Sequence, residues 1–275
     1  MSIGLAFLLG AVQGLSEFLP ISSSGHLVIF QSIFGGAELE KVSMMFDVFL
    51  HFGTLIAVFI AFWPDILDLL KGFTGLASDT LRGKPQISKH PSRRLFILLF
   101  VSLLPMLFIL PLMGKIESLF TNTLSVGIAL IMTALVLLIV DTVKNNKKDA
   151  SNTAMGGALL VGVMQMFAIL PGLSRSGMTI AGGTFAGMRR SFAVKYSFLL
   201  SIPVILGANI LTLFDAVRGG FDISLLLPCI VGIATAAVFG LIAIKILRYI
   251  SSKGKFRYFA VYCLLAGLIT IIFLK

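Results

Sequence analysis

Two stretches of this sequence share one pattern: Gln13 to His26 reads QGLSEFLPISSSGH, and Gln165 to Thr179 reads QMFAILPGLSRSGMT. In both, a glycine lies three residues before the glutamine, and Leu-Pro then leads to Ser-x-Ser-Gly, with one residue inserted after Pro171. The two stretches therefore look like two copies of one sequence motif. Glu, Arg, His and several hydroxyl side chains within an otherwise apolar sequence indicate a site for a charged ligand.

Composition predicts an all-α polytopic membrane protein. Apolar residues make up 57% of the 275 positions and charged residues 12%, which leaves too little polar surface for a soluble domain. A helix of about 20 apolar residues crosses a hydrocarbon core of roughly 30 Å. Six windows meet this requirement, so we expect six transmembrane helices, at about 42–64, 95–113, 118–141, 196–214, 222–248 and 256–274.

The two repeated segments, at about 4–35 and 154–190, differ from these windows because Pro and a Ser/Gly cluster interrupt each of them. Neither half of either segment is long enough to span the membrane alone. Such a break is tolerated at membrane depth only where protein or a wet cavity surrounds the freed backbone groups. We therefore expect two re-entrant helix-loop-helix hairpins.

Basic residues predict the orientation, because short loops rich in Lys and Arg stay cytoplasmic. The connection from Lys71 to Arg94 holds six of them. The cytoplasmic side also collects Lys144, Lys147, Lys148, Arg189, Arg190, Lys195, Arg248, Lys253, Lys255 and Arg257, and the opposite side only Lys41, Lys115, Arg218 and Lys275. This asymmetry accounts for the net charge of +10 without a nucleic-acid partner.

Each half of the chain then contains one hairpin and three spans: repeat one covers about 1–145 and repeat two about 154–275, within a single membrane domain of residues 1–275. Because three is odd, the second half runs inverted relative to the first. In such inverted repeats, broken helices meet near the bilayer midplane and form the binding site between them.

The first hairpin carries a carboxylate, three hydroxyls and an imidazole. Glu17 follows Gln13 by one helical turn, so both side chains share a helix face. Glu17 could bind a divalent cation, act in proton transfer, or only cap or pair with a neighbouring helix. The hydroxyls of Ser22, Ser23 and Ser24 begin the next half-helix, where anions bind readily. His26 is either a general acid, base or nucleophile, or a packed and hydrogen-bonded side chain.

The second hairpin supplies a cation between two hydroxyls. Arg175 lies between Ser174 and Ser176, and its planar fork suits phosphate oxygens. The alternative is an internal salt bridge from Arg175 to Glu17 or Asp47. Thr179 can donate a further hydroxyl to the same phosphate oxygens. Asp47 and His51, four residues apart, either support the site or pair with each other.

Taken together, these groups fit phosphoryl transfer, in which positioning and charge neutralisation do most of the work. Two reaction routes are open. In the first, Ser23 attacks phosphorus with His26 as its base and a phosphoserine forms; in the second, His26 activates a water molecule that attacks directly. The competing class is a transporter or flippase for an anion or a phosphorylated lipid, because broken helices in inverted repeats are also a transporter plan.

The two motifs resemble the signatures of the BacA-type undecaprenyl pyrophosphate phosphatases, and the likeness extends over the whole chain in length and span pattern. The resemblance implies an enzyme that converts undecaprenyl pyrophosphate to undecaprenyl phosphate and inorganic phosphate, recycling the carrier for peptidoglycan synthesis and conferring bacitracin resistance. It also implies a bacterial cytoplasmic membrane location, a site open to the outer face and a divalent cation, Mg²⁺ or Ca²⁺. A homodimer is compatible with it.

The family's functional positions fall here on Glu17, Ser22, Ser23, His26, Ser174, Arg175, Ser176 and Thr179. The first acidic position of the family is Glu or Gln, and this chain has Gln13. Because an amide is neither a base nor a strong metal ligand, we expect Glu17 to carry the carboxylate role alone and to be the protein's metal ligand.

Overall fold

We analysed the chain as a computed structural model, which describes residues 1–34, 37–83, 90–109, 122–144, 146–219 and 223–274, together with Ile87 and Pro111. Lys115 and Lys275, which the sequence predicts on the side opposite the cytoplasm, lie outside these residues. All named elements in them are helical: α1 Ile3–Phe18, α2 Ser23–Phe34, α3 Ala37–Leu81, α4 Pro91–Leu103, η2 Leu104–Phe108, α6 Thr123–Thr142, α7 Met155–Phe167, α8 Arg175–Phe185, α9 Arg190–Gly219, η5 Ile223–Leu225, α10 Leu226–Ser252 and α11 Arg257–Phe273.

The predicted class, an all-α multi-pass membrane protein, is confirmed at this level. Five helical stretches within the described residues are long and apolar enough to cross a membrane: Phe46–Leu81, Pro91–Phe108, Thr123–Thr142, Arg190–Gly207 and Leu226–Ser252. The sixth predicted span coincides with α11, which is apolar but has only 17 residues. Many large apolar side chains on α6, α10 and α11 are exposed, as expected where a helix faces lipid.

The two motif segments are broken where the sequence predicts. α1 ends before Pro20 and α2 begins at Ser23, while α7 ends before Pro171 and α8 begins at Arg175. Neither α1, with 16 residues, nor the three other hairpin helices reach the length of a span. Below, hairpin one means α1, α2 and their loop, and hairpin two means α7, α8 and theirs.

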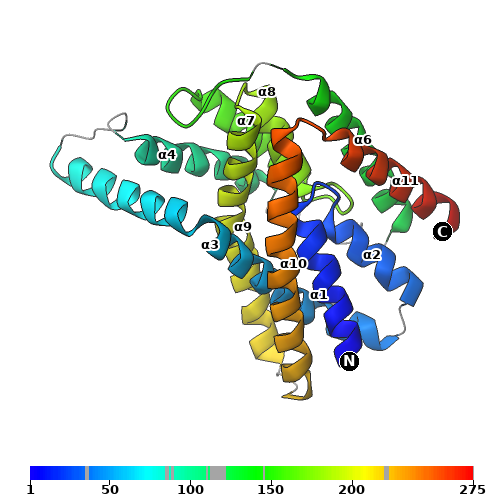
Figure 1. The fold of residues 1–275 in the computed structure, drawn as a ribbon. Coiled ribbons are helices and arrows are strands. Elements are labelled where there is room, and N and C mark those ends of the chain that lie inside the picture. The colour runs from blue at the N-terminus through cyan, green and yellow to red at the C-terminus, as the bar shows by residue number, and fades with distance from the viewer. Residues whose placement is uncertain are drawn as a thin grey trace.

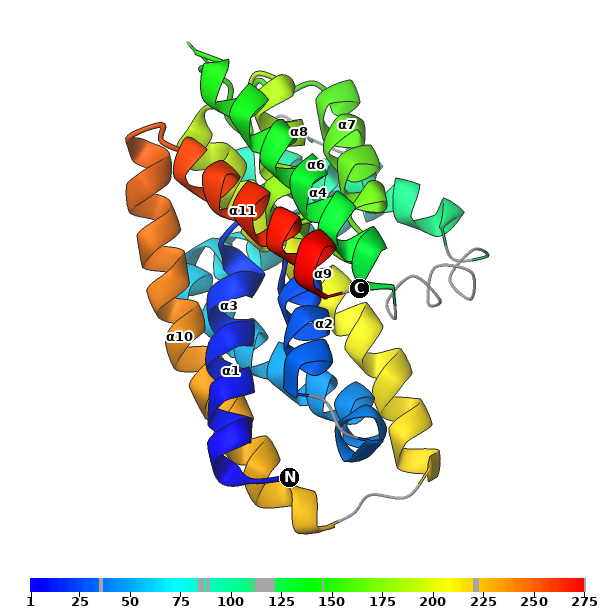
Figure 2. The ribbon, with the colours of Figure 1, turned by 90° about the vertical axis from the view of Figure 1, so that its right-hand side faces the viewer.

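Glycines allow the close helix packing that surrounds the hairpins. α1 runs along α10 (Figure 1), and a Cβ added to Gly10 or Gly14 would lie 2.7 Å or 2.6 Å from a main-chain oxygen of α10. On α7, a Cβ at Gly162 would lie 2.4 Å from the Ser102 carbonyl oxygen of α4. α6 and α11 lie side by side (Figure 2), and Gly127 and Gly267 face each other there. Small residues at such contacts are typical of membrane helix packing.

α3 continues beyond the predicted end of its span at residue 64 because a kink, rather than a helix end, lies there. Phe62 departs from helical geometry, with φ −126° and ψ 21°, two residues before Pro64. Proline lacks the N–H that continues a helix and therefore causes kinks. Beyond the kink, α3 extends away from α9 and α10 together with α4 (Figure 1). An ion pair between Asp65 and Lys195 holds α3 to α9 beside the kink.

Candidate functional site

The loops of the two hairpins meet in the interior of the protein. The Ser176 hydroxyl donates to the main-chain oxygen of Leu19 across the hairpins, at 3.1 Å. A Cβ added to Gly25 would lie 3.1 Å from the Cα of Gly172. Leu19 and Ser176 are 157 positions apart in sequence, so two distant segments of the chain form one site.

A serine caps the second helix of each hairpin. Ser22 Oγ accepts from the Gly25 amide at 3.2 Å, and Ser174 Oγ accepts from the Gly177 amide at 3.1 Å. Serine is a preferred cap because its oxygen satisfies an otherwise unpaired helix donor. Ser22 has φ +72°, a left-handed conformation that is uncommon for a non-glycine residue. The hydroxyls of Ser22 and Ser174 therefore hold the helix ends in shape, and the amides of the first turns of α2 and α8 point toward the loops.

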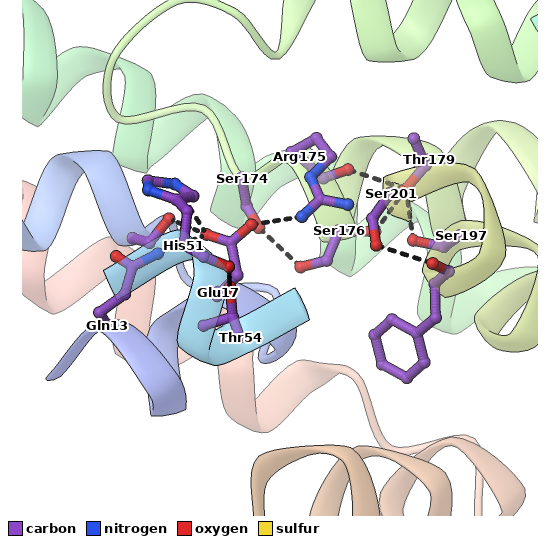
Figure 3. A network of polar contacts seen from close by, with 12 residues as sticks. Gln13, Glu17, His51, Thr54, Ser174, Arg175, Ser176, Thr179, Ser197 and Ser201 are labelled. Carbon is purple, nitrogen blue, oxygen red and sulfur yellow. Dashed lines mark hydrogen bonds and ion pairs between the residues drawn. The ribbon is translucent and has the colours of Figure 1, made fainter. Parts of the chain in front are cut away.

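Glu17 is the centre of the polar network (Figure 3). Its Oε2 accepts from the Ser23 hydroxyl at 2.6 Å and from the Gln13 amide at 3.1 Å. Its Oε1 forms an ion pair with the Arg175 guanidinium, and His51 Nε2 lies 3.9 Å from Oε2. The Glu17 side chain is 6% exposed and that of Arg175 is 16% exposed, so the charges are largely shielded from water.

The Arg175–Glu17 contact is the internal salt bridge that the sequence left as an alternative to an anion site. The salt bridge does not exclude an anion site, because a guanidinium has five N–H donors and can bind an anion while keeping or exchanging one partner. A phosphate bound by Arg175 would have to compete with the Glu17 carboxylate for its donors.

His26 does not contact Ser23 in the way that the first predicted route requires. Its Nδ1 lies 2.7 Å from the main-chain oxygen of Ser22, and its Nε2 lies 2.6 Å from the hydroxyl of Tyr262 on α11. The Ser23 hydroxyl donates to Glu17 instead. Glu17, not His26, is therefore the group placed to accept the Ser23 proton.

Thr179 lies behind the site rather than facing its centre. Its hydroxyl is within 2.8 Å of the Arg175 carbonyl oxygen and 2.6 Å of Ser197 Oγ on α9, and the residue is 1% exposed. Figure 3 shows Thr179 and Ser197 on the far side of Arg175 from Glu17. Thr179 thus positions the first turn of α8, which carries Arg175, and we assign it no direct phosphate contact.

The remaining predicted residues lie close to this network. Ser24 Oγ lies 3.4 Å from Ser22 Oγ, and Ser176 Oγ lies 3.2 Å from Ser174 Oγ. His51 Nδ1 lies 2.7 Å from the main-chain oxygen of Asp47, so His51 is aimed with its other nitrogen toward Glu17.

Sequence reasoning missed three supporting residues. Thr133 of α6 accepts from the Ser174 amide at 3.1 Å, Ser197 contacts Thr179, and Tyr262 contacts His26. All three lie on helices outside the two motifs, and a single hydroxyl in an apolar helix gives no signal of its own.

The oxygen atoms beside Glu17 suit a hard cation. Gln13 Oε1 is buried and has no hydrogen-bond partner, although the same amide group donates to Glu17. Ser23 Oγ is a third oxygen at the same carboxylate. The described residues contain no group of three His, Cys, Asp or Glu side chains that could hold a metal by themselves. A cation here would take its remaining ligands from water and from phosphate oxygens, as Mg²⁺ commonly does.

Fold and site together define a multi-pass membrane protein with an anion-compatible polar centre enclosed between two helical hairpins. The family model described as "Bacitracin resistance protein BacA" matches residues 6–269, so the chain belongs to the BacA family.

Several relatives of similar length carry the name "Undecaprenyl-diphosphatase". The relative from Methanosphaera stadtmanae is 40% identical over 272 residues, covering 97% of this chain and 96% of its own. That from Halothermothrix orenii is 41% identical over 273 residues, covering 99% and 98%, and that from Carboxydothermus hydrogenoformans is 39% identical over 276 residues, covering 98% and 96%.

Proposed function

We propose that this protein is an undecaprenyl-diphosphatase, which hydrolyses undecaprenyl pyrophosphate to undecaprenyl phosphate and inorganic phosphate. The observation that carries the proposal is the Ser23–Glu17–Arg175 arrangement, which joins a hydroxyl, a carboxylate and a guanidinium from both motifs. Family membership and the names of the relatives support it. The product would return to cell-wall synthesis as lipid carrier, and the activity would confer bacitracin resistance.

The proposal includes the inverted repeat, with repeat one at about 1–145 and repeat two at about 154–275, the hairpins re-entering the membrane and α11 as a sixth span. Packing supports it. α1 of the first half lies against α10 of the second, and α7 of the second half lies against α4 of the first, so each hairpin packs on a span of the opposite half. The α6–α11 pair, with its facing glycines, would lie on the pseudo-two-fold axis. In a bacterial cytoplasmic membrane, the site would open to the outer face.

Substrate binding in this proposal depends on charge exchange at Arg175. The pyrophosphate displaces Glu17 from part of the guanidinium fork, while the first-turn amides of α2 and α8 donate to its remaining oxygens. The prenyl chain stays among the apolar helices and lipid tails. A homodimer is not required for this site, because one chain supplies every group.

The first chemical step uses Ser23 as the nucleophile. Its Oγ bonds to the terminal phosphorus, the bond from that phosphorus to the bridging oxygen breaks, and undecaprenyl phosphate leaves with the bridging oxygen. The Ser23 proton passes to Glu17, whose Oε2 already accepts it at 2.6 Å. The result is a phosphoserine.

Water then hydrolyses the phosphoserine. Ser23 and His26 are three residues apart on α2 and so share a helix face. His26 Nε2 accepts a proton from the attacking water, the water oxygen bonds to phosphorus, and Ser23 Oγ leaves and recovers its proton from Glu17. Direct attack of water on the substrate, with His26 as base, is the second route and would leave no phosphoserine.

Glu17, Gln13 Oε1 and Ser23 Oγ would hold the divalent cation, Mg²⁺ or Ca²⁺, that the family resemblance implies. The cation would neutralise charge on the pyrophosphate oxygens.

The test is release of inorganic phosphate from undecaprenyl pyrophosphate by the purified protein in detergent, with and without chelator. We expect cation-dependent release that Arg175→Ala and Ser23→Ala reduce at least a thousandfold, while Lys195→Ala, a basic residue outside the site, retains activity. Brief acid quenching should trap phosphate on the wild-type protein and not on Ser23→Ala.

Detergent leaves no compartments, so phosphate release separates an enzyme from a transporter. Folded protein that binds the lipid but releases no phosphate would favour the transporter or flippase and refute the phosphatase.

A further inference from the structure

His26 is held in one tautomer by the backbone of its own helix. The main-chain oxygen of Ser22 lies 2.7 Å from His26 Nδ1 and also accepts from the His26 amide at 3.2 Å. A carbonyl oxygen can only accept, so Nδ1 carries the hydrogen. The neutral ring therefore has its lone pair on Nε2, the nitrogen that a general base uses here.

Tyr262 occupies that nitrogen. Its hydroxyl lies 2.6 Å from His26 Nε2, and because Nε2 has only a lone pair in the neutral ring, the phenol is the donor. The two rings are also stacked, with centroids 5.5 Å apart and planes inclined by 8°. One hydrogen bond at each nitrogen and a stacked ring leave the imidazole little freedom to rotate.

The helix that carries Tyr262 is fixed against hairpin one at a second point. The thiol of the neighbouring Cys263, which is fully buried, lies 3.5 Å from the main-chain oxygen of Pro20. Further along α11, a Cβ at Gly267 would lie 2.7 Å from the main-chain oxygen of Gly127 on α6. The helix that carries the tyrosine is therefore held next to hairpin one by Cys263 and against α6 by Gly267.

We propose that Tyr262 is a positioning residue for His26, an inference that rests on the proposed phosphatase function. The phenol keeps the imidazole aimed with Nε2 unprotonated, and it gives way when the attacking water takes its place at that nitrogen. This geometry corresponds to that of a general base oriented by hydrogen bonds on both nitrogens. Tyr262 comes from the last helix of the chain, 236 positions from His26, so the second repeat completes the base of the first.

The first test reads the tautomer directly and needs no activity. The chain has three histidines, so ¹⁵N labelling of histidine gives three ring systems, and His26→Ala identifies one of them. We expect a bare, hydrogen-bonded Nε2 at His26 in the ligand-free protein. Tyr262→Phe keeps the stacked ring but removes the donor, so the Nε2 signal should move downfield while the other two histidines stay unchanged.

The second test is kinetic. We expect Tyr262→Phe to lower kcat about tenfold with KM within about twofold, and to cause no further loss in a His26→Ala background, because a residue that acts through His26 has nothing left to position. Tyr258→Phe is the matched control, since Tyr258 lies one turn earlier on α11 with its ring 6.0 Å from Lys255.

An unchanged Nε2 signal in Tyr262→Phe, wild-type turnover, or the same fold-loss in both backgrounds would overturn the proposal. If the wild-type protein releases no phosphate, the proposed function fails, while the nitrogen spectrum still reports whether Tyr262 holds His26.

Discussion

Replacing Glu17 with glutamine should separate substrate binding from chemistry. Glu17 accepts from Arg175 and Ser23 at once, so in the ligand-free protein it both occupies the guanidinium and repels an incoming anion. Glutamine has nearly the same shape and keeps one oxygen that accepts from Arg175, but it has no negative charge. We therefore expect tighter anion binding and almost no turnover.

The magnitude follows from the contact that is weakened. Glutamine keeps a hydrogen bond to the charged guanidinium but loses the attraction between opposite charges. Because this pair is largely shielded from water, that loss exceeds the roughly 0–1 kcal/mol of an exposed pair and is on the order of 1.4 kcal/mol. This corresponds to about tenfold tighter binding of an anion. Loss of the proton acceptor for Ser23 should lower kcat by about 10²- to 10⁴-fold.

Inorganic pyrophosphate is the probe, titrated against the protein in detergent with chelator present, so that a cation at Glu17 does not contribute. Arg175→Ala should weaken binding at least tenfold in the same assay. Asp65→Asn, which removes the same charge from the Asp65–Lys195 pair, is the matched control and should bind like wild type. Weaker pyrophosphate binding by Glu17→Gln than by wild type would refute the idea that Glu17 and phosphate compete for Arg175.

Two further substitutions test the packing around the site. Gly162→Ala would place a Cβ 2.4 Å from the Ser102 carbonyl oxygen and should destabilise the protein by about 1–3 kcal/mol, seen as a lower thermal midpoint in detergent. As a control, the added Cβ of Gly156→Ala meets nothing within 4 Å, so this variant should keep the wild-type midpoint. Equal midpoints for the two variants would contradict the close contact between α7 and α4. Thr179→Val keeps the side-chain shape but loses the hydrogen bond to Ser197, so kcat should fall about tenfold with little change in pyrophosphate affinity, and a large loss of affinity instead would indicate direct phosphate contact.

The site shows where sequence reasoning reaches its limit. Glu17, Ser23 and Arg175 could be identified because charged and hydroxyl groups are rare and costly in an apolar chain. Their partners could not. The sequence predicted His26 as the base for Ser23, whereas in the structure Ser23 donates to Glu17. The two ring nitrogens of His26 face the Ser22 main-chain oxygen and the Tyr262 hydroxyl instead.

The sequence by itself determined the class of protein, the positions of the helix breaks and the residues that carry charge, because hydropathy, proline and caps act over a few neighbouring positions. Only the tertiary structure decided that Arg175 pairs with Glu17, that Thr179 lies behind the site, and that α11 brings Tyr262 to His26. Those contacts depend on how helices far apart in sequence pack, and glycines such as Gly127 and Gly267 set that approach through close backbone contact.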